Sequence, residues 1–218
     1  MSEKDQAAVT GAKRCVSLAN GVDLERFQPW PEEPEPARLL FIGSFGHLPN
    51  ILALDYFLRE VWPLLHEMQP VLHIIAGARH HYFQEMHESR VKLDLGQPGI
   101  EVEGFVSDVR LAYRRASIVI APLLASAGTN IKIMEAMAMG KAIVSTPGGV
   151  NGLNVLPDEE LVVAATARDF AIAIMRLNRD SDERKRLESA ARRAAEKKYS
   201  WDVIAREQAE LYKSLRRL

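Results

Sequence analysis

The chain has 218 residues, 47% hydrophobic and 26% charged, with a formal net charge of −1. This composition is typical of a globular protein with a sizeable core, and the near-neutral charge gives no global electrostatic reason to bind nucleic acid. The single cysteine, Cys15, excludes an internal disulfide and favours a reducing compartment. The N-terminus has no apolar signal-like core, and the longest apolar stretch is too short to span a bilayer. We therefore expect a soluble, cytoplasmic protein.

From residue 38 onward, the apolar pattern predicts strands that alternate with helices. Before it, the prolines and acids of residues 28–38 favour a stiff exposed loop. Pro63 is expected to kink or restart the first helix, which has an apolar stripe on one face. The expected strands are 38–43, 71–77, 100–106, 117–123, 141–146 and 160–165, and the expected helices are 50–68, 80–93, 107–116, 130–139, 166–178, 181–197 and 201–216.

The strands are rich in Val, Ile and Leu and lack polar alternation, which indicates a parallel sheet that is covered on both faces. Their alternation with helices predicts an α/β fold: a single Rossmann-like, doubly wound parallel sheet with helices on both faces. In such folds, ligands bind beyond the carboxyl ends of the strands. Three loops with suggestive composition are expected at that edge: 43–50, 104–108 and 123–130.

The loop before the expected helix 130–139 is the strongest candidate for a ligand site. Gly128 allows close backbone approach, and Thr129 or Asn130 can cap the helix. Lys132 then lies in the first turn, against the positive end of the helix dipole, where a cation is unfavourable unless an anion lies in front of it. Lysine and free backbone amides together suit phosphate. The alternative is a Lys132 side chain that extends into solvent, and the residues alone do not decide between the two.

Glu135 lies on the same helical face, and helical side chains lean back toward the N-terminus. Its two acceptor oxygens would suit the vicinal hydroxyls of a ribose. The alternative is a weak i, i+3 pair with Lys132, which the residues alone favour.

In the loop 43–50, backbone amides around Gly43 and Ser44 could cradle a phosphate, although a plain glycine-rich turn fits as well. This loop matches neither the three-glycine dinucleotide pattern nor a P-loop.

Two other features have weaker functional interpretations. His81 and Glu85 lie at helical i, i+4 spacing, but no Cys or Asp cluster completes a site, so we expect no metal. From Arg176 onward the chain is rich in Arg and Lys with interspersed acids. We interpret this stretch as a solvated helical face; the alternative is a patch that rests peripherally on an anionic membrane.

Four stretches of the chain match motifs of a known family and occur in the same order. They are "LANGVDLERFQP", "LLFIGSFGHLPNILAL", the long run from "VEGFVSDV" to "GGVNGL", and "YSWDVIAREQAELYKSL". The chain resembles the C-terminal, donor-binding half of GT-B-fold retaining glycosyltransferases of the "glycosyl transferases group 1" family. The resemblance implies transfer of a sugar from a UDP- or GDP-sugar to a glycan or lipid-linked acceptor, as in polysaccharide biosynthesis, with no metal or other cofactor. A peripheral position at the inner face of the membrane is compatible with it.

The resemblance also implies a domain organisation. Residues 1–15 resemble the crossover from an N-terminal acceptor domain that lies outside this chain, 16–198 the Rossmann-like donor domain, and 199–218 the closing helix. In the family that helix packs back across the cleft between the two domains. Here we expect it either to lie over its own domain or to expose an apolar face.

Residue roles follow from the same resemblance. Glu135 matches the glutamate that binds the donor ribose, and together with Lys132 it is our candidate for a catalytic contribution. Phe105 and Val106 match the segment that lines the nucleobase, although Phe105 could instead belong to the core. The positions that match the diphosphate-binding loops are Gly43, Ser44, Gly128, Thr129, Asn130 and Lys132.

The sequence departs from the family pattern in two places. Ala127 stands where many members have a glutamate near the donor sugar, and the loop 43–50 lacks the Arg and Lys that many members place there. Lys132 is expected to supply the missing cation. The departures leave the donor sugar open and keep one alternative, a non-catalytic nucleotide-binding or regulatory module of the same fold. A nicotinamide-dependent oxidoreductase is disfavoured because the three-glycine pattern is absent.

Overall fold

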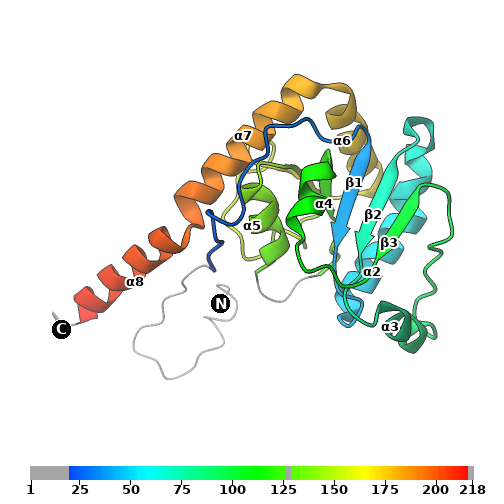
Figure 1. Cartoon of the computed structure of the whole chain (residues 1–218), viewed down its shortest axis with the longest axis horizontal. Helices are drawn as coiled ribbons and strands as arrows, with labels where there is room; N and C mark the ends of the chain where they lie inside the picture. Colours follow the sequence, from blue (N-terminus) through cyan, green and yellow to red (C-terminus); the bar gives the residue numbers. More distant parts are fainter. Residues whose placement is uncertain (1–19, 126–128, 216–218) are drawn as a thin grey trace.

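A computed structural model describes residues 20–125 and 129–215 of the chain. Its centre is a six-stranded, all-parallel sheet with the order β3-β2-β1-β4-β5-β6 (Figure 1). The order reverses between β1 and β4, as in a doubly wound fold, and this confirms the predicted fold class. The strands are β1 (Arg38–Ile42), β2 (Val71–Ile75), β3 (Ile100–Glu103), β4 (Ile118–Ala121), β5 (Ala142–Ser145) and β6 (Val162–Val163).

Helices cover both faces of the sheet, which therefore has a core on each side. The adjacent β1 residues Leu39 and Leu40 belong to opposite cores, because successive side chains of a strand point to opposite faces. Phe57 and Phe170 fill the core on the Leu39 side, and Tyr113 fills the core on the Leu40 side. The α-helices are α2 (Leu48–Tyr56), α3 (His80–His87), α4 (Arg110–Arg115), α5 (Ile131–Ala138), α6 (Ala167–Arg179), α7 (Ser181–Lys198) and α8 (Trp201–Leu215).

The helical segment after β1 changes its winding twice. α2 continues into a π-helical turn, η1 (Phe57–Val61), and then into a 3-10 helix, η2 (Trp62–Met68). Pro63 lies in the first turn of η2. Proline has no N–H to donate to the preceding turn, so the helix restarts there, as predicted.

Several elements are shorter than the sequence indicated, and α3, α4 and β6 differ the most. α3 ends at His87 instead of residue 93, and none of its residues is buried. Val91 and Leu93 still reach the core, but from irregular chain. β6 has two residues where a strand over 160–165 was expected. An apolar pattern indicates a segment that packs, but it does not determine where the helix or strand ends.

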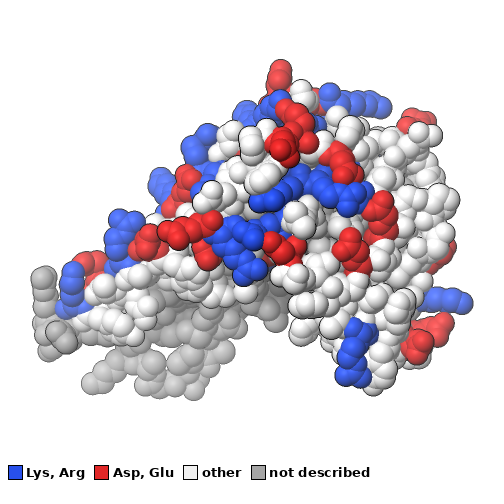
Figure 2. Space-filling model, viewed as in Figure 1, with Lys and Arg blue, Asp and Glu red and all other residues white. Residues whose placement is uncertain are grey.

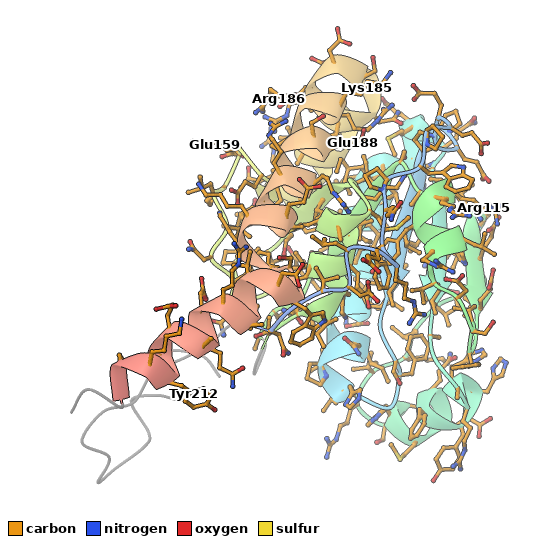
Figure 3. The ribbon with its side chains drawn as sticks, turned by 60° about the vertical axis from the view of Figure 1, so that its left-hand side comes forward. Arg115, Glu159, Lys185, Arg186, Glu188 and Tyr212 are labelled. Carbon is orange, nitrogen blue, oxygen red and sulfur yellow. The ribbon has the colours of Figure 1, made fainter. Side chains whose placement is uncertain are left out.

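The last helix, α8, projects away from the sheet beyond the end of α7 (Figure 1, Figure 3). Ile204 is buried, whereas Trp201 and Tyr212 are 54% and 59% exposed. Of the two arrangements expected for the closing helix, the structure has the one that exposes apolar side chains. The expected crossover 1–15, with Cys15, lies outside the described residues.

Charges of both signs alternate along α7 and α8 on the face shown in Figure 2. Arg192 pairs with Glu196 at 2.7 Å, and Lys185 on the same helix pairs with Glu33 at 2.8 Å. This mixture is what the interpretation as a solvated helical face predicts. Among the helices that the structure describes, none is both long and apolar enough to cross a membrane.

Candidate functional site

The candidate residues gather at the carboxyl edge of the sheet, where the strand order reverses. β1 leads into the glycine loop 43–46, and the neighbouring β4 leads toward the N-terminus of α5. A parallel sheet brings these two loops together beside the reversal point, where doubly wound folds bind ligands. Both loops had been singled out from the sequence.

The glycine loop is held in place by the adjacent strand and by α2. The backbone N–H of Gly43 donates to the Ile75 carbonyl at 3.0 Å, which ties the loop to β2. A Cβ atom on Gly43 would lie 2.9 Å from Asn50 Cγ and 2.9 Å from the Phe41 ring. Only glycine fits there without displacing its neighbours, so this residue is required by a close approach. The Ser44 hydroxyl accepts a hydrogen bond from the N–H of Gly46 at 3.2 Å.

Lys132 points inward, toward this loop. Its Nζ donates to Asn50 Oδ1 at 2.9 Å and lies 5.5 Å from the centre of the Phe41 ring. Asn50 Nδ2 in turn donates to the Ser44 carbonyl at 2.9 Å. The alternative in which Lys132 extends into solvent is therefore wrong. Burial lowers the pKa of Lys132 to about 8, and the nearby charge of Glu135 only partly offsets this.

Glu135 is partly buried one turn further along α5. Its Oε2 lies 3.1 Å from the Tyr113 hydroxyl, which is also 3.0 Å from the Lys132 carbonyl. A phenol has one proton, so it donates to one of these acceptors at a time. Within the described part of the chain, no ion pair closes between Glu135 and Lys132, and the alternative of an i, i+3 pair is wrong. Burial raises the pKa of Glu135, against the lowering effect of Tyr113, Arg26 and Lys132.

Asn130 occupies the N-cap position of α5, but its side chain makes no capping hydrogen bond. Its amide donates instead to the Gly149 carbonyl in the loop after β5. The sequence offers Thr129 or Asn130 as the cap, and the structure excludes the Asn130 side chain from that role. The Gly149 carbonyl thus competes with the helix amides for the Asn130 side chain. Thr129 precedes the cap and is partly buried, and Gly128 and Ala127 lie outside the described residues.

The remaining candidates are Phe105 and Val106, and Val106 packs against the core cluster that contains Tyr113. Both follow β3 and line a cavity of about 800 Å³, whose lining includes neither Lys132 nor Glu135. Phe105 is 75% exposed, which excludes the alternative that it belongs to the core. Beside it, Asp108 accepts hydrogen bonds from the Arg110 guanidinium at 2.6 to 3.0 Å, and this contact lowers the pKa of Asp108 to about 2.

Three residues that contribute to the site are not predicted from the sequence. Asn50 falls within the loop 43–50, and Tyr113 within an expected short helix. Arg26 lies in the segment before β1, and its charge lowers the pKa of both Glu135 and Asp108. Across residues 20–125 and 129–215, no group of three or more His, Cys, Asp or Glu side chains is placed to hold a metal ion.

An all-parallel sheet of this order, with helices on both faces, defines a Rossmann-like domain. The model of the family "Glycosyl transferases group 1" matches residues 36–180. The chain belongs to this family, and its solved structural neighbours are GT-B glycosyltransferases.

Three similar proteins illustrate the relationship. An uncharacterised 44.6 kDa protein in the cps region of Klebsiella pneumoniae is 26% identical over 144 residues, 65% of this chain and 37% of that protein. Anabaena HepE, crystallised with UDP and glucose, has 18% identity and a TM-score of 0.73, over 98% of this chain and 61% of HepE. A TarM variant from S. aureus, crystallised with Fondaparinux, alpha-GlcNAc-glycerol and UDP, has 15% identity and a TM-score of 0.74, over 97% of this chain and 43% of TarM. The chain thus spans less than two thirds of each.

Proposed function

We propose that the chain is the donor-binding domain of a retaining glycosyltransferase that uses a UDP- or GDP-sugar. The observation that carries the proposal is the partly buried ammonium of Lys132, held beside the glycine loop by neutral partners, Asn50 and Phe41. A cation that has left water without a paired anion is unfavourable, and a diphosphate would supply the missing charge. UDP is favoured over GDP because HepE and TarM were both crystallised with UDP.

Each residue has one part in the proposed site. Lys132, together with the amides of the glycine loop and of the first turn of α5, would bind the donor diphosphate. Glu135 would accept hydrogen bonds from the two ribose hydroxyls, oriented by the Tyr113 hydroxyl. Phe105 and Val106, at the carboxyl end of β3, would contact the nucleobase. Gly43 would allow the backbone to approach the phosphates closely.

The proposed reaction breaks the bond between the anomeric carbon and the diphosphate oxygen. The acceptor hydroxyl forms the new bond on the same face of the sugar, and its proton passes to the released phosphate oxygen. The chain's contribution is electrostatic, because Lys132 stabilises the negative charge that develops on the leaving diphosphate. Glu135 fixes the ribose and hence the position of the anomeric carbon. The acceptor, a glycan or a lipid-linked sugar, would bind to a further domain.

A second candidate is a non-catalytic nucleotide-binding or regulatory module of the same fold. It is favoured by the glycine loop 43–46, which contains neither Lys nor Arg. Both candidates bind a nucleoside diphosphate, so binding does not separate them. Transfer or hydrolysis of sugar from a UDP- or GDP-sugar by the protein would eliminate the non-catalytic candidate.

Calorimetric titration with UDP, GDP, 2′-deoxy-UDP and NAD tests the proposal. We expect one nucleoside diphosphate to bind and NAD not to bind. Glu135→Ala should weaken that binding about tenfold, because two hydrogen bonds to a charged group are lost. The same variant should also lose the preference for UDP over 2′-deoxy-UDP, or for GDP over 2′-deoxy-GDP if GDP is the ligand.

The matched control is Glu188→Ala, which removes a carboxylate of comparable burial from α7, away from the site. This variant should bind the nucleotide as the wild type does. An unchanged dissociation constant in folded Glu135→Ala would remove the assigned role of Glu135. Failure of the folded wild type to bind UDP or GDP would contradict the proposed function.

A further inference from the structure

We propose that Asn50 is a positioning residue, which holds the Lys132 ammonium over the glycine loop so that α5 supplies the cation for the diphosphate. This inference rests on the proposed function, because it assigns a ligand to Lys132. It answers a question that the sequence raised, namely how a glycine loop without a cation of its own could bind phosphate.

Both polar atoms of the Asn50 side-chain amide form hydrogen bonds. Asn50 Oδ1 accepts from Lys132 Nζ at 2.9 Å, across 82 positions of sequence, and Asn50 Nδ2 donates to the Ser44 carbonyl at 2.9 Å. The amide therefore connects α5 to the loop after β1. An amide is suited to this because it has an acceptor and two donors on adjacent atoms.

The loop itself is built around this side chain. Gly43 lies so close to Asn50 that a Cβ atom would approach Asn50 Cγ within 2.9 Å. The Asn50 backbone N–H also donates to the His47 carbonyl at 2.9 Å, which fixes the start of α2. Asn50 is thus held from its backbone and has little freedom to follow Lys132 elsewhere. The lysine, with its long flexible stem, is the partner whose direction is set.

The neutrality of Asn50 matters for its proposed role. The groups that face the Lys132 ammonium are Asn50 from α2, the Phe41 ring from β1 and the charge of Glu135 from α5 itself. An aspartate at position 50 would pair with the ammonium and compete with the diphosphate. An alanine would leave the ammonium without its acceptor and free to turn toward solvent. Asparagine directs the cation and leaves its charge available to a ligand.

The experiment compares Asn50→Ala and Asn50→Asp with the wild type, with Asn178→Ala on α6 as a matched control away from the site. Two quantities are measured: UDP affinity by calorimetry between pH 6.5 and 9.5, and the pKa of the Lys132 amine by NMR. Asn50→Ala should bind UDP about 5- to 10-fold more weakly, the effect expected for loss of a hydrogen bond to a charged group. Asn50→Asp should weaken binding at least as much and raise the pKa of the Lys132 amine, because it adds an anion beside it.

The outcomes separate this inference from the proposed function. If the wild type binds UDP and Lys132→Met weakens binding, but neither Asn50 variant changes the affinity or the pKa of Lys132, then the positioning role is overturned and the proposed function stands. If the folded wild type binds neither UDP nor GDP, both are overturned. Asn50→Asp keeps the side-chain shape, so it tests the inference even where Asn50→Ala fails to fold.

Discussion

Arg38 and Lys132 are two cations at opposite edges of the same sheet, and they differ in the charged groups that surround them. Arg38 begins β1 at the amino edge, is 2% exposed, and forms ion pairs with Glu35 and Glu101. Its hydrogen bond lowers the pKa of Glu101. Lys132 follows the carboxyl end of β4, and its amine contacts a neutral amide and an aromatic ring.

The difference agrees with a structural role for the amino edge and with the ligand site proposed at the carboxyl edge. Removal of a cation from water is costly unless anions and hydrogen bonds compensate it. Arg38 has two carboxylates, so its charge is satisfied within the chain. Lys132 has one hydrogen bond to a neutral amide, and the charge of Glu135 only partly offsets its burial, so its pKa is lowered. Arg38 thus forms two ion pairs, although its buried Nε has no hydrogen-bond partner. Lys132 forms no ion pair within the described residues and lies beside the glycine loop, which agrees with the diphosphate site proposed above.

The largest expected effect is a loss of stability when the Arg38 ion pairs at the amino edge are removed. Arg38→Ala should lower the free energy of unfolding by about 3 kcal/mol, because it removes a large buried side chain together with its ion pairs. Urea denaturation measures the loss, and the nucleotide affinity of the folded fraction should not change. Arg59→Ala is the matched control: Arg59 is 71% exposed and pairs with Asp55 at 3.5 Å, so the loss should stay below about 0.5 kcal/mol. Equal losses in the two variants would contradict the comparison.

The next effect is the pH dependence of UDP affinity, which we expect to follow the titration of Lys132. The folded-state pKa of Lys132 is about 8, so the ammonium is lost as pH rises through that value, and we expect UDP affinity to fall several-fold between pH 7 and 9.5. Calorimetry at both pH values measures this fall. In Lys132→Met, affinity should be low at both, and any remaining fall would show that another group titrates.

The lowered pKa of Lys132 also affects stability, and this effect has the opposite direction: stability rises with pH, whereas UDP affinity falls. Between about pH 8 and 10.5, Lys132 is neutral in the folded state and protonated in the unfolded chain. The unfolded state then binds more protons, so the contribution of this group to stability rises with pH across that window. Lys132→Met should abolish that rise, which urea denaturation at pH 8 and pH 10 would detect as a difference from the wild type.

The smallest expected effect sharpens the role of Glu135. Tyr113→Phe removes the hydroxyl that contacts Glu135 Oε2 and the Lys132 carbonyl, and leaves the ring in its core. We expect UDP to bind about 3- to 5-fold more weakly, because one orienting hydrogen bond is lost. Binding of 2′-deoxy-UDP should change less, since it lacks one of the hydroxyls that Glu135 would hold. Equal losses for both nucleotides would indicate a general packing defect.

The sequence predicted the fold well because the strands carry strong, continuous apolar signals, and Pro63 restarts its helix for a local reason. It also placed Lys132 and Glu135 on one helical face, which depends only on spacing. What it could not predict was their partners. The contact between Lys132 and Asn50 spans 82 positions, and that between Glu135 and Tyr113 spans 22. Nor could it predict that Asn130 would bond to the loop after β5, since local propensity favours capping.

The two edge strands, β3 and β6, affect a different property, the tendency of copies of the chain to associate. β3 is an edge strand of four residues in which Glu101 and Glu103 are exposed on one face, and β6 at the other edge has only two residues. Short edges and charged side chains hinder the addition of a foreign strand. The sheet is thereby protected from edge-to-edge growth and amyloid-like stacking by residues outside the cluster around Lys132 and Glu135.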